Sequence, residues 1–179
     1  RSSDLAIVVY SSKTGFTLKY AKKLSEDLNC ELLSIKEIKT RNWDKDEIVI
    51  YGGSLKAGLI RDLSHFNKTV KVNPDRLIVF ACGLTSREDQ VKIQEIKKAN
   101  HLENSPFYYF PGGVDYSRLG FASRSLLKMI CKSIKKDPQK DQMMAKRLEK
   151  SGDYTELDLL EEMIEQIKSK SRFYEINVE

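Results

Sequence analysis

One stretch near the N-terminus decides the fold: Ile7-Val8-Val9-Tyr10-Ser11-Ser12-Lys13-Thr14-Gly15-Phe16-Thr17. An apolar run ends there in hydroxyl side chains and one glycine, and a helical pattern follows. Apolar residues recur in that pattern at steps of three and four, as one face of a helix requires: Leu18, Ala21, Leu24 and Leu28. The stretch therefore predicts a short strand, a tight polar loop and the start of a helix.

The loop between this strand and helix has the chemistry of an anion site. A helix N-terminus offers unpaired N–H groups and the positive end of the helix dipole. Ser12, Thr14 and Thr17 add hydroxyl donors, and Gly15 lets the backbone come close to a ligand. Because the loop holds no Arg and one Lys, Lys13, neutral donors would do most of the binding, as suits a single phosphate group. The competing interpretation is a capped helix whose hydroxyls only satisfy backbone donors.

Four more apolar runs follow, separated by helical patterns. Strands are predicted over residues 30–35, 47–51, 76–82 and 106–110, and helices within 60–72, 87–100, 119–135 and 154–170, with a helical piece around 143–148. Apolar strands that lack polar alternation and alternate with helices indicate a parallel sheet with both faces buried, so the predicted class is α/β. The third strand is expected to end at Gly52-Gly53-Ser54, and Ser86 to cap the helix after the fourth strand.

Ligands of such a sheet bind beyond the carboxyl ends of its strands, where the chain places the loops 11–17, 52–58 and 83–88. Two nucleotide-binding motifs, GxxxxGK[ST] and GxGxxG, are absent from the sequence. Cys82 and Arg87 enclose four residues, one fewer than the loop of a cysteine-based phosphatase needs. These absences exclude the commonest alternative sites on a sheet of this kind.

The composition fits one globular domain over residues 1–179, with 40% apolar and 32% charged side chains. No apolar run approaches the roughly 20 residues that cross a bilayer, and Arg1-Ser2-Ser3-Asp4 shows no signal-peptide pattern. The three cysteines lack the spacing of a disulfide framework or a zinc site: Cys30, Cys82 and Cys131. Since the two histidines are also far apart in sequence, no metal site is expected, and the predicted location is the cytoplasm.

The net charge of +5 is concentrated in one part of the chain. Residues 118–150 hold ten Lys or Arg against three Asp or Glu, a local +7, inside an expected insert at about 114–153. The segment 118–136 reads as a basic amphipathic helix, with an apolar stripe (Leu119, Ala122, Leu126, Ile130, Ile134) beside a basic flank (Arg124, Lys128, Lys132, Lys135). Such a helix can bind an anionic membrane surface or an acidic partner, or it can be a core helix with a solvated face. No nucleic acid partner is expected, because aromatic residues do not interleave with the basic ones.

The loop Ser12-Lys13-Thr14-Gly15-Phe16-Thr17 resembles the phosphate loop of the flavodoxin family, [ST]-x-T-G-x-T after the first strand, at every fixed position. The resemblance implies a three-layer flavodoxin-like sandwich, a five-stranded parallel sheet in the order 2-1-3-4-5, and FMN as cofactor. It places the FMN phosphate in 12–17 and the isoalloxazine ring between the loops that follow the third and fourth strands. The implied cofactor-binding residues are Ser12, Lys13, Thr14, Gly15, Phe16, Thr17, Ser54, Leu55, Lys56, Ala57, Gly58, Gly83, Leu84, Thr85 and Arg87.

The chain departs from the electron carriers of that family at the implied ring site. Leu55 and Leu84 stand where stacked aromatic side chains are usual, and Lys56 and Arg87 where acidic ones are usual. A cation near the N1–C2 edge of the ring would stabilise the reduced anionic flavin and make its reduction potential less negative. The alternative is that both cations point into solvent and leave the potential unchanged.

The insert makes the layout similar to the flavodoxin-type, menaquinone-dependent protoporphyrinogen oxidases, with residues 110–118 leading from the fifth strand into it. Two roles stay open: an electron carrier with a redox partner protein, and a dehydrogenase that passes electrons from a porphyrin substrate, protoporphyrinogen IX, to a quinone at the inner face of the membrane. A third interpretation is a flavin-free module that binds a membrane surface or a protein. No catalytic acid or base is identified, and Asp115 and Tyr116 are assigned to a turn and a packing contact.

Overall fold

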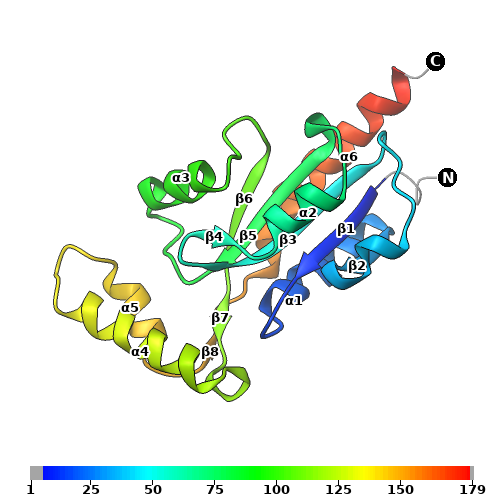
Figure 1. Cartoon of the computed structure of the whole chain (residues 1–179). Helices are drawn as coiled ribbons and strands as arrows, with labels where there is room; N and C mark the ends of the chain where they lie inside the picture. Colours follow the sequence, from blue (N-terminus) through cyan, green and yellow to red (C-terminus); the bar gives the residue numbers. More distant parts are fainter. Residues whose placement is uncertain (1–5, 178–179) are drawn as a thin grey trace.

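The computed structural model describes residues 6–177, and its centre is a parallel sheet (Figure 1). The strands lie in the order β2-β1-β3-β5-β6, which confirms the predicted order 2-1-3-4-5. Their bounds are β1 (Ala6–Ser11), β2 (Glu31–Ser34), β3 (Ile48–Lys56), β5 (Leu77–Gly83) and β6 (Phe107–Pro111). A short sixth strand, β4 (Leu59–Ile60), pairs with β3 in the antiparallel direction. All five parallel strands point their carboxyl ends to the same edge of the sheet.

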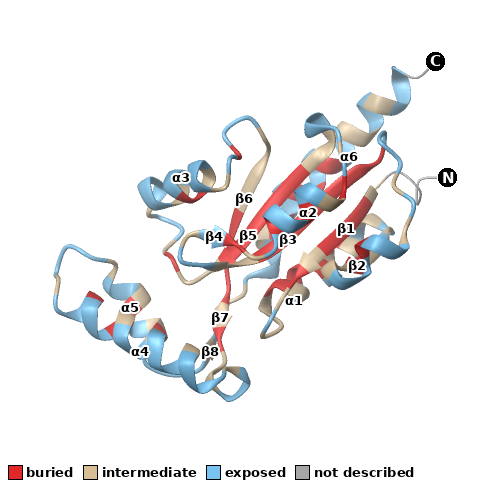
Figure 2. Ribbon diagram, viewed as in Figure 1, coloured by how far each residue is buried: buried red, intermediate tan, exposed pale blue. Residues whose placement is uncertain are grey.

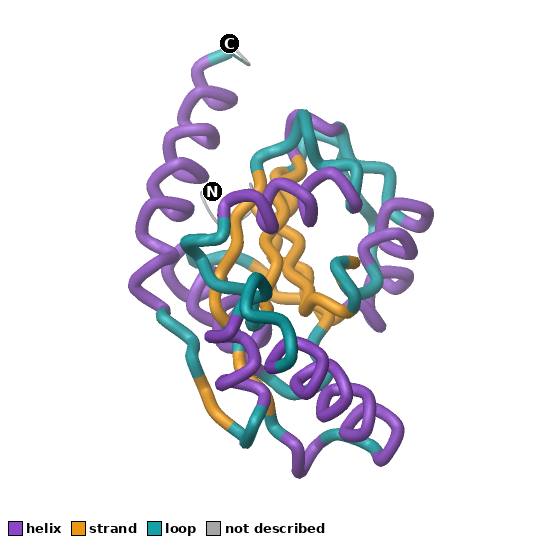
Figure 3. The backbone as a smooth tube through the Cα atoms, turned by 90° about the vertical axis from the view of Figure 1, so that its left-hand side faces the viewer, coloured by secondary structure: helices purple, strands orange, loops and turns teal. Residues whose placement is uncertain are grey.

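Helices cover both faces of the sheet, as Figure 3 shows with the strands between them. One layer consists of α1 (Phe16–Leu28) and α6 (Leu160–Ile176), and the other of α2 (Leu63–Thr69) and α3 (Gln90–Ala99). Successive residues of β1 alternate between the layers, since Ile7 and Val9 pack toward α2 and Val8 packs toward α1. The central strands are therefore buried on both sides (Figure 2). Short 3₁₀ helices complete the fold: η2 (Ile35–Thr40), η3 (Pro74–Arg76), η4 (Tyr116–Arg118) and η5 (Leu157–Leu159).

The third strand is longer than predicted, because it continues through both glycines to Lys56. Gly52 pairs with Tyr10 of β1 on one side and with Phe80 of β5 on the other. A Cβ atom at Gly52 would lie 2.0 Å from Cζ of the Phe80 ring. This glycine is therefore needed for packing inside the sheet, and the prediction that it ends the strand was wrong.

The chain turns back only at Ala57 and Gly58, whose φ angles are 52° and 78°. Two consecutive residues with positive φ are typical of the tight turn that joins antiparallel strands. The segment 54–58, predicted as a loop, is thus the end of β3 plus the turn of a β3–β4 hairpin.

Two helices begin later than predicted. Asp89, rather than Ser86, caps α3, and its carboxylate accepts a hydrogen bond from the Lys92 backbone N–H at 3.0 Å. The Ser86 hydroxyl instead donates to Glu88. At the other end of the chain, η5 precedes α6, which starts at Leu160 rather than at Tyr154.

The basic insert forms a helical hairpin beside the carboxyl edge of the sheet, at the lower left of Figure 1. It contains α4 (Phe121–Lys135) and α5 (Gln142–Leu148), and it is enclosed by an antiparallel pair of two-residue strands, β7 (Gly113–Val114) and β8 (Gly152–Asp153). The hairpin has a small core of its own, made of Cys131, Ile134, Ala145 and Leu148. Leu84, from the loop after β5, packs against this core and ties the insert to the sheet.

The buried face of α4 differs from the predicted stripe. Leu127, Ile130 and Ile134 pack in the insert core, whereas Leu126 is 42% exposed. Leu126 and Leu127 both fit a helical period, and the position of α5 decides which of them is covered. No helix within residues 6–177 combines the length and the apolar content that crossing a bilayer requires. The same residues include no group of three or more His, Cys, Asp or Glu side chains placed to hold a metal ion.

Candidate functional site

The loop between β1 and α1 is built around Gly15. Its φ of 98° is a left-handed conformation that glycine adopts without strain. The Gly15 N–H donates to the Ser12 hydroxyl oxygen at 3.1 Å, which closes the loop and leaves the Ser12 hydroxyl proton free to point at a ligand. No side chain caps α1 at this position, and its first turn contains no acidic residue. The positive end of the helix dipole is therefore uncompensated by the protein.

Thr17, in the first turn of α1, carries the most informative atom of the site. Thr17 is 1% exposed, and its Oγ1 is the one buried side-chain polar atom within residues 6–177 that has no hydrogen-bond partner of good geometry; the Cys82 thiol beside it is only a weak partner. A buried hydroxyl without a partner costs about 1–3 kcal/mol. A phosphate oxygen is the kind of acceptor that would remove this cost, so the loop fits the group that its sequence pattern implies.

Cys82 lies against the Thr17 hydroxyl at the end of β5. Burial raises the pKa of its thiol to about 12, although a weak hydrogen bond with the Thr17 side chain opposes the shift. The thiol is therefore protonated at neutral pH, which argues against a cysteine nucleophile at this loop. Its role is packing, next to Gly112, where a Cβ atom would lie 2.8 Å from the Cys82 sulfur.

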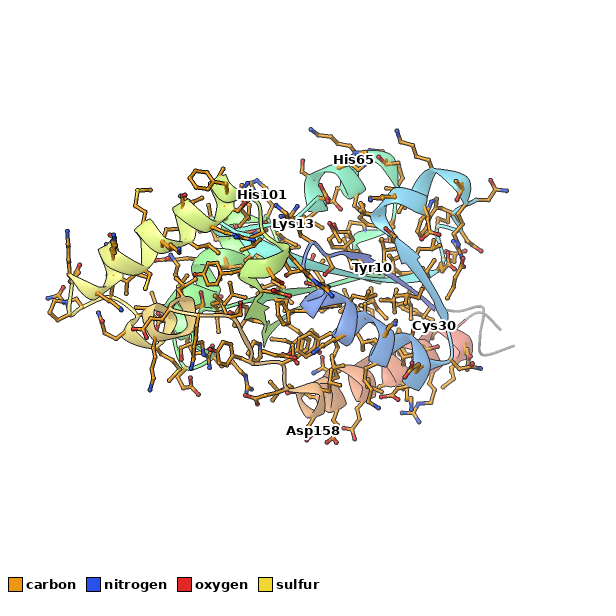
Figure 4. All side chains as sticks on the ribbon, turned by 90° about the horizontal axis from the view of Figure 1, so that it is seen from below. Tyr10, Lys13, Cys30, His65, His101 and Asp158 are labelled. Carbon is orange, nitrogen blue, oxygen red and sulfur yellow. The ribbon has the colours of Figure 1, made fainter. Side chains whose placement is uncertain are left out.

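The two segments expected to hold a flavin ring lie side by side at the same edge. Ser54 of β3 is paired with Cys82 of β5, so the hairpin and the loop after β5 leave the sheet together. A Cβ atom at Gly83 would lie 3.0 Å from Cδ1 of Leu55, which shows how closely the two segments pack. Figure 4 shows this part of the molecule from below, with Tyr10 and Lys13 labelled at the end of β1.

The remaining expected ring residues divide into buried and exposed ones. Thr85 is buried, and its carbonyl accepts a hydrogen bond from the Tyr109 hydroxyl at 2.8 Å. Leu84 faces the insert core. Lys56 and Arg87 are exposed. That these two cations make the reduction potential of a bound flavin less negative therefore stays a prediction.

Several residues that shape the site were missed from the sequence because they come from distant parts of the chain. The Ser11 hydroxyl donates to Asp62 Oδ2 at 2.6 Å, and Arg61 Nε donates to the Ser54 hydroxyl at 3.2 Å. Asn100 binds the hairpin turn, and Arg118 reaches the phosphate-type loop from the insert. The residues missed are Arg61, Asp62, Asn100 and Arg118. No local sequence pattern marks them, because each one bonds to a residue more than five positions away in the chain.

The outer face of α4 presents apolar side chains among basic ones. Phe121 is 87%, Met129 61% and Leu126 42% exposed. The exposed cations Arg124, Lys128 and Lys132 share this helix, whose first turn holds no acidic residue. Figure 2 colours most of α4 pale blue, interrupted by tan and red residues. The sequence prediction of a basic amphipathic helix is therefore retained, with a different set of inward-facing residues.

A five-stranded parallel sheet in this order, with an uncapped helix and a glycine-containing hydroxyl loop after its first strand, defines a flavodoxin-type α/β protein. The family model described as "Flavodoxin domain" matches residues 7–141. The chain belongs to this flavodoxin domain family.

Solved structures match the chain only at low sequence identity and low TM-score. A flavodoxin from the domain Archaea is 18% identical, with a TM-score of 0.42, over 63% of this chain and 87% of that one. A candidate flavoprotein from Bacteroides uniformis is 14% identical, with a TM-score of 0.39, over 65% and 96%. One from Bacteroides eggerthii is 17% identical, with a TM-score of 0.40, over 71% and 98%. A search of curated proteins gave no match.

Proposed function

We propose that the protein binds FMN and acts as a flavin-dependent redox protein. The observation that carries the proposal is the orphaned Thr17 hydroxyl in the first turn of an uncapped helix, next to Gly15. Ser12 and Thr14 would add hydroxyl donors to the phosphate, and Leu55 with the backbone at Gly83 would hold the ring. FMN supplies the electron chemistry when bound, and the protein supplies binding and orientation.

The test is a titration of flavin-free protein with FMN, followed by flavin fluorescence and by the visible absorption spectrum. Saturable binding at one site per chain is expected, and riboflavin, which lacks the phosphate, should bind at least about tenfold more weakly because it cannot use the loop. Protein that takes up no FMN would overturn the proposal and favour a flavin-free interaction module.

The proposal also includes a binding partner in the cell, and the exposed apolar and basic side chains of α4 suggest its nature. We propose that α4 contacts an anionic bilayer surface, because exposed Phe121 and Met129 can enter the interface while the surrounding cations meet lipid headgroups. Sedimentation with vesicles containing phosphatidylglycerol, compared with purely zwitterionic vesicles, tests this contact. Wild-type protein that binds neither vesicle, or both equally, would contradict it, and so would a Lys128→Glu, Lys132→Glu variant that binds the anionic vesicles as well as wild-type protein does.

Two finer roles remain as predictions for the redox chemistry. Electron exchange with a redox partner protein needs no substrate pocket, whereas quinone-linked oxidation of protoporphyrinogen IX needs one. The comparisons lend no support to the second role. Steady-state oxidation of protoporphyrinogen IX with a quinone acceptor, set against one-electron exchange with a ferredoxin-type protein, separates the two.

A further inference from the structure

Arg118 lies on the phosphate-type loop although it is 104 residues away in sequence. Its Nη1 donates a hydrogen bond to the Thr14 carbonyl at 3.2 Å. The same nitrogen would be 3.3 Å from a Cβ atom placed on Gly15. The guanidinium group thus contacts Thr14 and lies next to the place where a side chain at Gly15 would begin.

The insert holds Arg118 in this position through η4. The Tyr116 N–H donates to the Ser151 hydroxyl at 3.0 Å, and the Tyr116 hydroxyl donates to the Leu148 carbonyl, so the C-terminal end of the insert fixes this turn. Asp115 caps the turn by accepting from the Ser117 N–H at 3.0 Å, and its other oxygen lies 3.4 Å from Arg118 Nε. The folded turn η4 and its contacts within the insert therefore direct the Arg118 side chain at the loop.

Without Arg118, the loop would have little positive charge available to a phosphate. Lys13 is exposed, and Lys19 is ion-paired with Asp153 of β8. Besides Asp153, Asp115 contacts Arg118 and Asp62 accepts from the Ser11 hydroxyl. Arg118 uses one N–H on Thr14, and its side chain is 63% exposed, so other guanidinium donors remain accessible to an incoming anion.

We propose that Arg118 is a phosphate-binding residue, supplied by the insert, that makes the loop selective for a doubly charged phosphate ester. The inference rests on the proposed FMN function and deepens it. A guanidinium binds phosphate through a rigid fork of N–H groups, and such charge-assisted bonds are about twice as strong as neutral ones. Neutral donors alone, as the sequence of the loop suggested, then supply only part of the affinity. The insert and the loop become one binding unit, because the cation belongs to one and the hydroxyls to the other.

The experiment compares Arg118→Gln with the wild-type protein in titrations of FMN and of riboflavin. FMN affinity should fall about 10- to 100-fold, whereas riboflavin affinity should change less than about twofold because no phosphate is lost. Arg118→Lys, which keeps the charge but loses the fork, should lie between the two. Arg124→Gln is the matched control: Arg124 Nε donates to Leu119 O at 2.8 Å within the insert, and its removal should leave FMN affinity within about twofold.

A second readout is the salt dependence of binding. FMN affinity should weaken as salt rises more steeply than riboflavin affinity, and Arg118→Gln should flatten the FMN dependence. If wild-type protein binds no FMN, the proposed function fails. If it binds FMN and Arg118→Gln binds it equally well, the function stands and the role of Arg118 is wrong. Equal weakening of FMN and riboflavin would show that Arg118 only supports the fold, and would also overturn the inference.

Discussion

The Asn100 side chain binds the β3–β4 hairpin at Gly58 in the turn and at Ile60 in β4. Its carbonyl oxygen accepts from the Ile60 N–H at 2.9 Å, and its Nδ2 donates to the Gly58 carbonyl at 2.9 Å. The same Nδ2 also bonds to the Ile96 carbonyl at the end of α3. One residue therefore connects the hairpin expected to touch the flavin ring to the helix that follows β5.

Replacing Asn100 by alanine should lower the free energy of unfolding by about 1–3 kcal/mol, because the N–H of the buried Ile60 loses its acceptor. Asn100→Asp should be no milder: its carboxylate keeps the acceptor for Ile60 but faces the Gly58 and Ile96 carbonyls. Urea unfolding followed by circular dichroism measures both. Gln94→Ala, at an exposed position of the same helix, is the control and should stay within about 0.5 kcal/mol. An alanine variant as stable as this control would mean that the bridge contributes nothing.

Gly52 is expected to tolerate no side chain. A Cβ atom there would lie 2.0 Å from the Phe80 ring, so Gly52→Ala must displace a fully buried side chain at a cost of about 1–3 kcal/mol or more. Gly120→Ala is the matched control, since no atom lies within 4 Å of its Cβ position. Thermal unfolding of the two variants should separate them clearly. The double variant Gly52→Ala, Phe80→Leu should lose less stability than the sum of its single changes, and strict additivity would contradict the proposed clash.

These positions also show how far the sequence could predict the fold. The strands and their order follow from apolar runs that lack alternation, and such runs are local. The extent of β3 depends instead on the Phe80 ring across the sheet, so a Gly-Gly pair that resembles a turn is in fact a strand interior. The face of α4 depends similarly on where α5 packs, and two adjacent leucines fitted the period equally well.

The candidate site was predictable only where it is continuous in sequence. The loop from Ser12 to Thr17 carries its chemistry in neighbouring residues, and its strand–loop–helix setting is confirmed. Arg118 and Asn100 reach the site through folding of the insert and of α3, over separations of 104 and 42 residues. Sequence patterns carry no sign of such contacts. The excess of cations in residues 118–150 predicted a basic surface, and it gave no indication that one of these cations contacts the loop.

Stability should fall at alkaline pH because of Cys82. Burial raises the pKa of its thiol to about 12, against about 8.5 in an unfolded chain. A raised native pKa gives stability that is complete below the unfolded pKa and decreases as pH rises from there toward the native pKa. The loss is up to about 1.4 kcal/mol per pH unit, as the unfolded thiol ionises and the native one does not.

The measurement is the free energy of unfolding between pH 8.5 and 10.5 for wild-type protein and Cys82→Ala. Cys82 adds to the raised pKa of the Tyr20 and Tyr109 hydroxyls, but burial is the largest cause and holds both pKa values above this pH range in either protein, so the tyrosines contribute little to the difference. The variant should show the shallower decline. Parallel curves would mean that the native thiol ionises as readily as the unfolded one.

Thr17→Val should separate the stability of the protein from its binding function. Valine keeps the shape of threonine and removes the buried hydroxyl that lacks a partner, so the flavin-free protein should gain about 1 kcal/mol in free energy of unfolding. The same change removes a donor from the proposed phosphate site, so FMN affinity should fall about tenfold while riboflavin affinity hardly changes. Urea unfolding and flavin fluorescence measure the two effects.

Thr17→Ser keeps the hydroxyl and serves as the control, with FMN affinity close to that of the wild-type protein. The sign of the stability change matters as much as its size, because a hydroxyl kept for packing gives no reason for valine to be the more stable choice. If valine stabilised the protein and left FMN binding unchanged, the unpartnered atom would be an ordinary core defect beside Cys82. If valine destabilised it, the hydroxyl would already be satisfied without any ligand. The combination of higher stability and weaker FMN binding is the result that only a phosphate ligand explains.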